Sequence, residues 1–499
     1  MFRWHHGIAY TCMILSALIL IACGSDDNDD GPSLDTRLRT EIDVQGLTGD
    51  PGALRNLPSI DDPIPALGRV LFFTKGLGGD EDSACVSCHH PLLGGGDDLA
   101  LSIGVGAEQP DLLGPGRVHS QDAEEWDGGP PVPRNAPTTF NSGYWDSVMF
   151  HDGRVESFGK TPDANGDDGE GIRDPDTDFG VANPDAGDNL AWDQSRFPVT
   201  SPEEMRGFEF AAGESNEELR SKLVARFQND AWLPLFQEAF DSGEDAEMLI
   251  TERTIFEAIG EYERSQEFSE SPWAAYVQGD EDAIKKAAKR GALLFFRSVS
   301  EGGTYCVQCH SGDAFTDELF AVMAFPQAGR GKGDGDDGDE DFGRFRETGD
   351  AEDLYAFRVP TLLNVAATGP WGHAGMFATL EQVVRHHLDP ADSIDDYFTN
   401  FDSNLALLEY SGYAIQSENA ESNTRKALAQ LQANRELGLD NVRPVDVDLS
   451  DGQISDLVAF LESLTDSRVD DADALSPWIA SDANDDPNPD GLRVEAIIR

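Results

Sequence analysis

The sequence predicts a mainly α-helical chain built from two similar domains in tandem, with long acidic loops. A Cys-x-x-Cys-His motif occurs twice, at residues 85–89 and 306–310, and each copy follows an apolar run that ends in two phenylalanines. This repetition indicates an internal duplication. With 499 residues, the chain also exceeds what one hydrophobic core usually supports, so two domains are expected.

Each Cys-x-x-Cys-His motif indicates covalent attachment of one c-type haem. Two cysteines three positions apart can bond the two vinyl groups of a haem, and the next residue then places an imidazole below the iron. The alternatives are a structural zinc site, a thioredoxin-like redox pair and chance. The histidine in both copies and the export signal described next favour haem. The predicted attachment residues are Cys85, Cys88, His89, Cys306, Cys309 and His310.

The N-terminus predicts export and a lipid anchor. An apolar run over residues 11–22 is too short to span a bilayer, and it leads into Leu-Ile-Ala-Cys at Cys23, which resembles a bacterial lipobox. We interpret residues 1–22 as a removed signal and Cys23 as acylated; an ordinary signal peptide with a stray cysteine is the alternative. Haem is attached outside the cytoplasmic membrane as well, so the predicted location is the periplasm, and Gly24 favours the outer membrane.

The chain is strongly acidic. Its net charge of −58 excludes nucleic acid and an anionic membrane surface as partners, so membrane contact is expected only through the lipid anchor. The charge suits a cationic electron-donor protein, and it equally suits a solvated surface in a salty habitat. Residues 163–167 and 482–486 alternate oxygen ligands as calcium loops do, but neither has the glycine of an EF-hand at the sixth place. Solvated loops are therefore the preferred interpretation.

The predicted elements follow one another in a simple order. Residues 24–37 are too polar to fold, and residues 102–138 are rich in glycine and proline and indicate loop. Helices are expected from about residue 65, over 216–228 and 252–268, and over 283–296 and 450–464. The predicted segments are 1–22 (signal), 23–59 (acidic tether and lead-in), 60–270 (N-terminal haem domain), 271–465 (C-terminal haem domain) and 466–499 (an acidic tail with little structure).

Seven motifs in order resemble those of the di-haem bacterial cytochrome c peroxidases and their MauG-type relatives, and together they extend over residues 60–465. The resemblance implies two cytochrome c-like domains, with peroxide chemistry at the N-terminal haem, electron relay by the C-terminal haem, and one calcium ion between them. The motifs are residues 68–73, the two haem-attachment motifs, 134–138, 152–154, Pro198 with Glu204-Met205, and 357–380 with His373 at its centre.

The resemblance also implies roles for single residues. Glu204 is the expected acid–base group, with Gln194 beside it, because cleaving peroxide requires a proton to move from one oxygen to the other. Arg154 is expected to contact a haem propionate or to act as a structural partner. The implied calcium ligands are Asn135 and, through backbone carbonyls, Thr368 and Pro370, which suits a cation that prefers oxygen.

Three positions depart from the family pattern. Where many of the peroxidases have a histidine that caps the first iron, this chain has Val105, so the first haem should be open without prior reduction; His90, next to His89, is poorly placed to cap it instead. His151 replaces the tryptophan between the haems and is a poorer electron relay.

The third departure concerns the far ligand of the second iron, which is a methionine or a tyrosine in the family. The same spacing from His373 leads here to His387. His386 is the rival, and only one of the two can face the iron because successive helix positions point about 100° apart. A ligand elsewhere, with both histidines on the surface, is the remaining alternative. A second imidazole should lower the haem potential relative to methionine.

The resulting hypothesis is a lipid-anchored periplasmic di-haem peroxidase. It would reduce hydrogen peroxide with electrons from a small cytochrome c or copper protein. The alternatives are a MauG-like oxidase of a partner protein and a di-haem electron-transfer cytochrome without turnover chemistry. The oligomeric state is left open, with a homodimer as one option.

Overall fold

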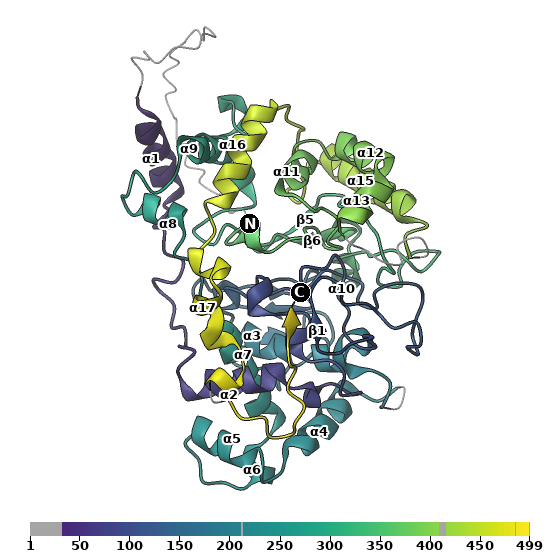
Figure 1. The fold of residues 1–499 in the computed structure, drawn as a ribbon. Helices are drawn as coiled ribbons and strands as arrows, with labels where there is room; N and C mark the ends of the chain where they lie inside the picture. The colour runs from purple at the N-terminus through teal and green to yellow at the C-terminus, as the bar shows by residue number, and fades with distance from the viewer. Residues whose placement is uncertain (1–31, 211–212, 409–415, 485, 499) are drawn as a thin grey trace, which may run out of the picture.

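The computed structural model describes residues 32–210, 213–408, 416–484 and 486–498. Its fold is mainly helical with a few short strands (Figure 1), which confirms the predicted fold class. The lower half of Figure 1 contains α2–α7, and the upper half contains α9, α11, α12, α13, α15 and α16. In the described part of the chain, no helix has the length and apolar character that crossing a membrane requires.

The helices fall into two groups along the chain. The first group is α2 (Pro63–Phe73), α3 (Leu190–Ser195), α4 (Asn216–Phe227), α5 (Leu233–Ala239), α6 (Ala246–Leu249) and α7 (Glu252–Arg264). The second is α8 (Pro272–Val277), α9 (Lys286–Phe296), α10 (Phe345–Thr348), α11 (Leu380–Leu388), α12 (Pro390–Thr399), α13 (Phe401–Leu407), α15 (Ala420–Leu437) and α16 (Asp451–Glu462). The expected helices are confirmed to within a few residues at their ends.

The strands are short and brace the loops. β2 (Val148–Met149), β3 (Val155–Ser157) and β4 (Ile172–Arg173) form an antiparallel sheet. β5 (Phe320–Val322) pairs antiparallel with β6 (Ala356–Arg358), where the two halves of the molecule meet (Figure 1). β1 (Leu112–Leu113) pairs in parallel with β7 (Ile497–Ile498), at the other end of the chain.

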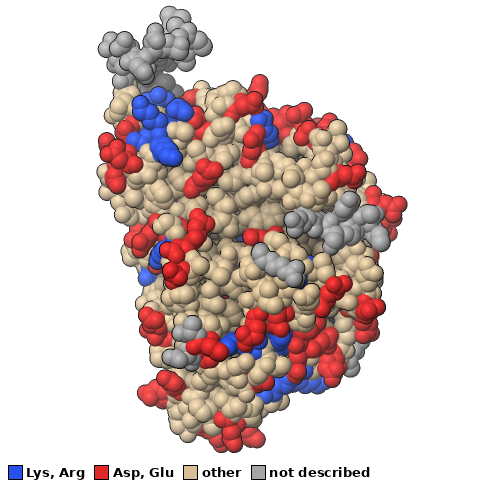
Figure 2. Space-filling model, in the orientation of Figure 1, with Lys and Arg blue, Asp and Glu red and all other residues tan. Residues whose placement is uncertain are grey.

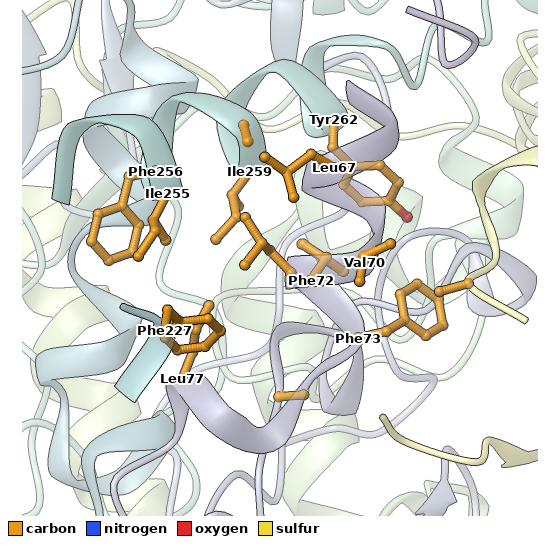
Figure 3. Close-up of a cluster of buried hydrophobic side chains, with 14 of the residues drawn as sticks. Leu67, Val70, Phe72, Phe73, Leu77, Phe227, Ile255, Phe256, Ile259 and Tyr262 are labelled. Carbon is orange, nitrogen blue, oxygen red and sulfur yellow. The ribbon is translucent and has the colours of Figure 1, made fainter. Parts of the chain in front are cut away.

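Each half is built on one closely packed helix pair, α2 with α7 and α9 with α16. The pairs approach at equivalent glycines. A Cβ atom on Gly68 would lie 1.9 Å from the carbonyl oxygen of Ala258, and one on Gly291 would lie 1.9 Å from that of Asp456. Figure 3 shows apolar side chains of α2 and α7 facing one another. The repeated glycine contact supports the internal duplication inferred from the sequence.

We expect Gly68→Ala to destabilise the protein by about 1–3 kcal/mol, because the new methyl group must push apart two helix backbones. Urea unfolding of the haem-loaded protein, followed by circular dichroism, measures this change. Gly452→Ala, in α16, is the matched control. No described atom lies within 4 Å of the place that its new methyl group would take, so alanine should be neutral or stabilising there by up to about 1 kcal/mol. Equal stabilities for the two variants would contradict the close-packing argument.

The acidic lead-in is more ordered than predicted. Helix α1 (Leu34–Gln45) begins within the segment expected not to fold, with Ser33 as its N-cap. Leu38 and Ile42, one turn apart, are buried in the apolar core of the second half. Asp35 binds Lys289 at 2.5 Å. The prediction for residues 34–37 is therefore wrong, because two buried apolar residues and ion pairs with α9 stabilise the helix.

The C-terminal tail is also more structured than predicted. After α16 the chain crosses from the upper half onto the lower half, where α17 (Ala472–Leu475) and β7 lie (Figure 1). Leu475 is fully buried, the hydroxyl of Tyr262 donates to the carbonyl of Trp478 at 2.8 Å, and Arg69 pairs with Asp486 at 2.7 Å. The expectation of little structure is wrong, since widely spaced apolar residues anchor the tail without helical periodicity.

Candidate haem centres

The first Cys-x-x-Cys-His motif lines a large cavity in the N-terminal half. The space between its lining residues that atoms do not fill, open solvent at its mouth included, is about 1180 Å³. Cys85, Cys88 and His89 lie on its wall, and Gln194 and Glu204 line it as well. The cavity therefore brings the residues predicted to attach a haem together with the two residues predicted to act on peroxide.

His89 is oriented as a metal-binding histidine. Its Nδ1 donates to the carbonyl oxygen of Gly95 at 3.1 Å, which leaves Nε2 as the free nitrogen. Burial lowers the pKa of His89, so the ring is neutral and able to ligate. Burial also raises the pKa of Cys88 to about 12, so this thiol is protonated before haem is attached.

The second motif has the same arrangement. Nδ1 of His310 donates to the carbonyl oxygen of Phe315 at 3.1 Å. The rings of His310 and His387 have centroids 6.3 Å apart. Two imidazoles on opposite sides of one metal, each at a metal–nitrogen distance of about 2 Å, have this separation. These residues thus fit a haem iron between them.

The structure distinguishes His387 from its neighbour His386. Nδ1 of His387 donates to the carbonyl oxygen of Val383 at 2.9 Å, within α11, so its Nε2 is free. His386 uses both nitrogens: Nε2 lies 2.8 Å from the carbonyl oxygen of Met323, and Nδ1 lies 3.2 Å from the hydroxyl of Ser393. Of these two neighbours, His387 is therefore the one with a nitrogen left for a metal.

Glu204 is presented to the first cavity by the short π-helical turn η6 (Pro202–Arg206). Its backbone is fixed, because its carbonyl oxygen accepts from the hydroxyl of Ser83 at 2.9 Å and Gly104 packs directly against it. Burial raises the pKa of the Glu204 carboxyl, and Arg154 and Lys332 partly oppose this effect. A carboxyl with a raised pKa accepts a proton more readily than an ordinary glutamate does.

Neither Val105 nor His90 is among the described residues that line the first cavity. His90 accepts from the backbone N–H of Leu92 at 3.0 Å and packs edge-on against Phe73, so it points into the protein core. Val105 is buried and bonds through its backbone to Glu203. Among the described residues that line the cavity, the histidines are His89 and His151.

His151 and Arg154 lie beside a buried network of charges. Nε2 of His151 donates to the carbonyl oxygen of Asn135 at 3.0 Å, and burial, followed by the charge of Arg134, lowers the pKa of His151 to about 3. Arg154 pairs with Asp152 at 3.2 Å and also lines the cavity. Arg154 thus contacts Asp152 and also faces the first cavity.

The residues expected to bind calcium come from segments that lie together. The backbone N–H of Asn135 donates to the carbonyl of His373 at 2.9 Å, and Gly94 packs against Ala367 and Thr368. In the sequence, Pro370 lies between Thr368 and His373. In the described ranges, no group of three or more Asp, Glu, His or Cys side chains could hold a metal ion. A cation here would therefore depend on carbonyl and amide oxygens.

The acidic segments that resemble calcium loops are used in ion pairs and turns. Arg55 lies 3.6 Å from Asp163, and Asp482 pairs with Arg493 at 2.6 Å. The carboxylate of Asp146 accepts from the backbone N–H of Asn165 at 2.8 Å. These contacts agree with the preferred interpretation of the segments as loops.

Three further cavity residues could not be anticipated from the motifs. Trp145 is buried, and the Cζ atom of Arg358 lies 3.5 Å from the centroid of its ring. Glu263 reaches the cavity from α7, and burial raises its pKa to about 8. Lys332 comes from the C-terminal half. Each lies outside the family motifs, and only the fold brings it to the haem space.

The comparisons with known proteins agree with this geometry. Residues 64–282 match the family model described as di-haem cytochrome c peroxidase. The methylamine utilization protein MauG of Methylorubrum extorquens is 28% identical over 326 residues, which cover 65% of this chain and 68% of that protein. The cytochrome c551 peroxidase of Nitrosomonas europaea is 27% identical over 318 residues, with coverages of 64% and 70%.

Solved structures support the fold. The crystal structure of a MauG-like protein associated with microbial copper homeostasis superposes with a TM-score of 0.51 at 22% identity and covers 84% of this chain and 94% of that one. The diheme peroxidase BthA from Burkholderia thailandensis gives 0.50 at 20% identity, with coverages of 84% and 89%. Together, the two haem-attachment motifs, the family match and the relatives show that this chain is similar to the di-haem cytochrome c peroxidases and MauG over most of its length.

Proposed function

We propose that the protein reduces hydrogen peroxide to water at its first haem centre, with two electrons that enter through the second centre from a small cytochrome c or copper protein. The balance is one peroxide, two electrons and two protons to two water molecules. The observation that carries this proposal is the place of Glu204, a half-buried carboxyl whose pKa is raised by desolvation, on the wall of the cavity that His89 also lines. The chain is an oxidoreductase of the cytochrome c peroxidase type.

Each residue of the first cavity would have its own role in the reaction. A haem held there by Cys85, Cys88 and His89 would supply the one-electron chemistry of its iron. Glu204 takes a proton from one oxygen of peroxide and returns it to the other, which makes the departing oxygen a better leaving group. Gln194 orients the peroxide by hydrogen bonding. Met205, which is buried beside Cys85, helps to exclude water.

At the second centre, we propose that Cys306 and Cys309 attach the haem and that His310 and His387 ligate its iron. The free Nε2 atoms and the 6.3 Å ring separation support this assignment. We also propose one calcium ion at Asn135, Thr368 and Pro370, supported by the contacts that bring these segments together. The calcium would brace the loop between the two centres.

The location and partners belong to the same proposal. Residues 1–22 and Cys23 lie outside the described residues, so periplasmic export and the lipid anchor, outer membrane included, rest on the sequence. Acidic side chains are spread over the face seen in Figure 2, which would suit a cationic electron donor. The oligomeric state remains open, including a homodimer.

The test is donor oxidation by the haem-loaded protein combined with electron paramagnetic resonance. We expect reduced cytochrome c or copper protein to be oxidised when peroxide is added, and a high-spin ferric signal to disappear after one equivalent of peroxide. Loss of that signal without donor oxidation would favour a MauG-like oxidase of a partner protein. Two low-spin signals that peroxide does not change, before and after reduction, would favour an electron-transfer cytochrome.

A further inference from the structure

Lys332, which lies in the C-terminal half of the chain, contributes a positive charge to the wall of the first haem cavity. Lys332 belongs to the acidic, glycine-rich insert at residues 329–341, which follows β5. It lines the same cavity as Glu204 and Arg154. β5 lies where the two halves meet (Figure 1), so an insert from the C-terminal half can reach the N-terminal haem space.

The insert has a defined structure that places Lys332. Arg330 pairs with Asp127 at 2.6 Å, and the backbone N–H of Lys332 donates to the carbonyl of Glu340 at 2.9 Å. Gly331 has φ +61, and a Cβ atom there would lie 2.3 Å from the carbonyl oxygen of Asp339. Because only glycine fits this turn, the backbone has a fixed direction just before Lys332, and the side chain of Lys332 lies at the cavity.

The far end of the insert is bound to the N-terminal half. Both oxygens of Asp341 accept from Arg134, at 2.6 and 2.7 Å. Arg134 also donates to Asp152 at 2.6 Å. The insert therefore has a fixed position relative to the residues that line the first cavity.

The other cations of the cavity wall are already engaged. Arg134 binds Asp152 and Asp341, and Arg154 binds Asp152. Arg358 donates to the carbonyl of Val148 at 3.2 Å. Over the ranges that the structure describes, Nζ of Lys332 makes no hydrogen bond or ion pair. Of the described cations that line this cavity, Lys332 is therefore the one that is free to interact with a charged group inside it.

The carboxylate of Glu204 is likewise without a hydrogen-bond partner in the described part of the chain. The charged groups around Glu204 are Arg154, Lys332, Glu203 and Arg134. The two arginines share Asp152 through ion pairs, which offset part of their charge. No described carboxylate bonds to Lys332, and the negative charges that favour its charged form are those of Glu204 and Asp152. The opposite charges of Lys332 and Glu204 face one cavity from the two halves of the molecule.

We propose that Lys332 is a positioning residue for Glu204, whose positive charge keeps that carboxylate ionised and turned into the first haem cavity. A residue of the C-terminal half thereby completes the lining of the first cavity, where peroxide would react. This inference rests on the proposed role of Glu204. An ionised Glu204 can accept a proton, and a nearby positive charge favours the ionised form.

The experiment compares Lys332→Gln, Lys332→Arg and the wild type as full-length, haem-loaded proteins. Infrared difference spectra follow protonation of the Glu204 carboxyl against pH, and Glu204→Gln identifies its band. We expect Lys332→Gln to move the midpoint of this titration upward by at least about half a pH unit, and Lys332→Arg to restore it. The matched control is Lys286→Gln, which removes an equal charge from an exposed position at the start of α9 and should leave the midpoint unchanged.

An unchanged midpoint in Lys332→Gln would overturn the proposal, and so would the absence of a titrating Glu204 band. A changed haem potential with an unchanged midpoint would show that Lys332 neutralises a haem propionate instead. The haem absorbance spectrum of each variant checks that it is folded and loaded. Because the titration is measured without turnover, its outcome is separate from the proposed peroxidase activity, which Glu204→Gln tests by itself.

Discussion

Replacing Glu204 by glutamine should lower peroxide turnover by about 10²–10⁴-fold, the range over which a positioned acid–base group contributes to catalysis. Glutamine keeps the shape of the side chain but cannot take up and return a proton. Because burial raises the pKa of Glu204 and the ionised form is the base, turnover of the wild type should rise as pH increases through that pKa. This rise should be absent from the variant. Stopped-flow absorbance with a reduced donor protein measures both effects.

Glu203→Gln is the control for this experiment. Glu203 is adjacent and half-buried, and its carboxylate accepts from the hydroxyl of Ser201 at 3.2 Å. It does not line the cavity, so its loss should change turnover by less than about threefold, well below the effect of an acid–base group. Similar losses in both variants would mean that the turn η6 is disturbed, and that Glu204 has no specific role in the proton transfer.

The haem-attachment residues could be predicted from the sequence because their chemistry depends on local spacing. Cys85, Cys88 and His89 lie within one turn, and no distant contact is needed to recognise them. The choice between His386 and His387 is different. The family spacing from His373 leads to His387 and leaves its neighbour as a rival. The bonds of His386 to Met323 and Ser393 show that the ring of this rival is already engaged.

Segments that fold only against distant parts of the chain could not be predicted. Helix α1 is stable because Leu38 and Ile42 enter a core that lies mainly after residue 270. The tail is ordered because Leu475 and Trp478 pack against Phe140 and Phe268. Lys332 stands in an insert whose composition is typical of a solvated acidic loop, and its place in the cavity depends on the contact between Asp341 and Arg134. In each case, local composition predicts disorder and long-range contacts determine the structure.

Replacing His387 by methionine should raise the reduction potential of the second haem by on the order of 100 mV, since axial ligands set haem potentials over roughly 0.8 V and methionine favours the reduced iron more than a second imidazole does. Spectroelectrochemical titration measures the two haem potentials separately. The expected change is confined to one haem, because His387 faces His310 and does not line the first cavity.

His386→Gln provides the contrast to this variant. Glutamine can replace the hydrogen bonds of His386 to Met323 and Ser393, so both potentials should stay close to those of the wild type. A large shift in His386→Gln, with none in His387→Met, would reverse the assignment and require α11 to rotate by about 100° when haem is bound. Such a rotation would break the bond of His386 to the carbonyl of Met323. The hydrogen-bonding pattern of α11 therefore argues for His387 independently of the family spacing.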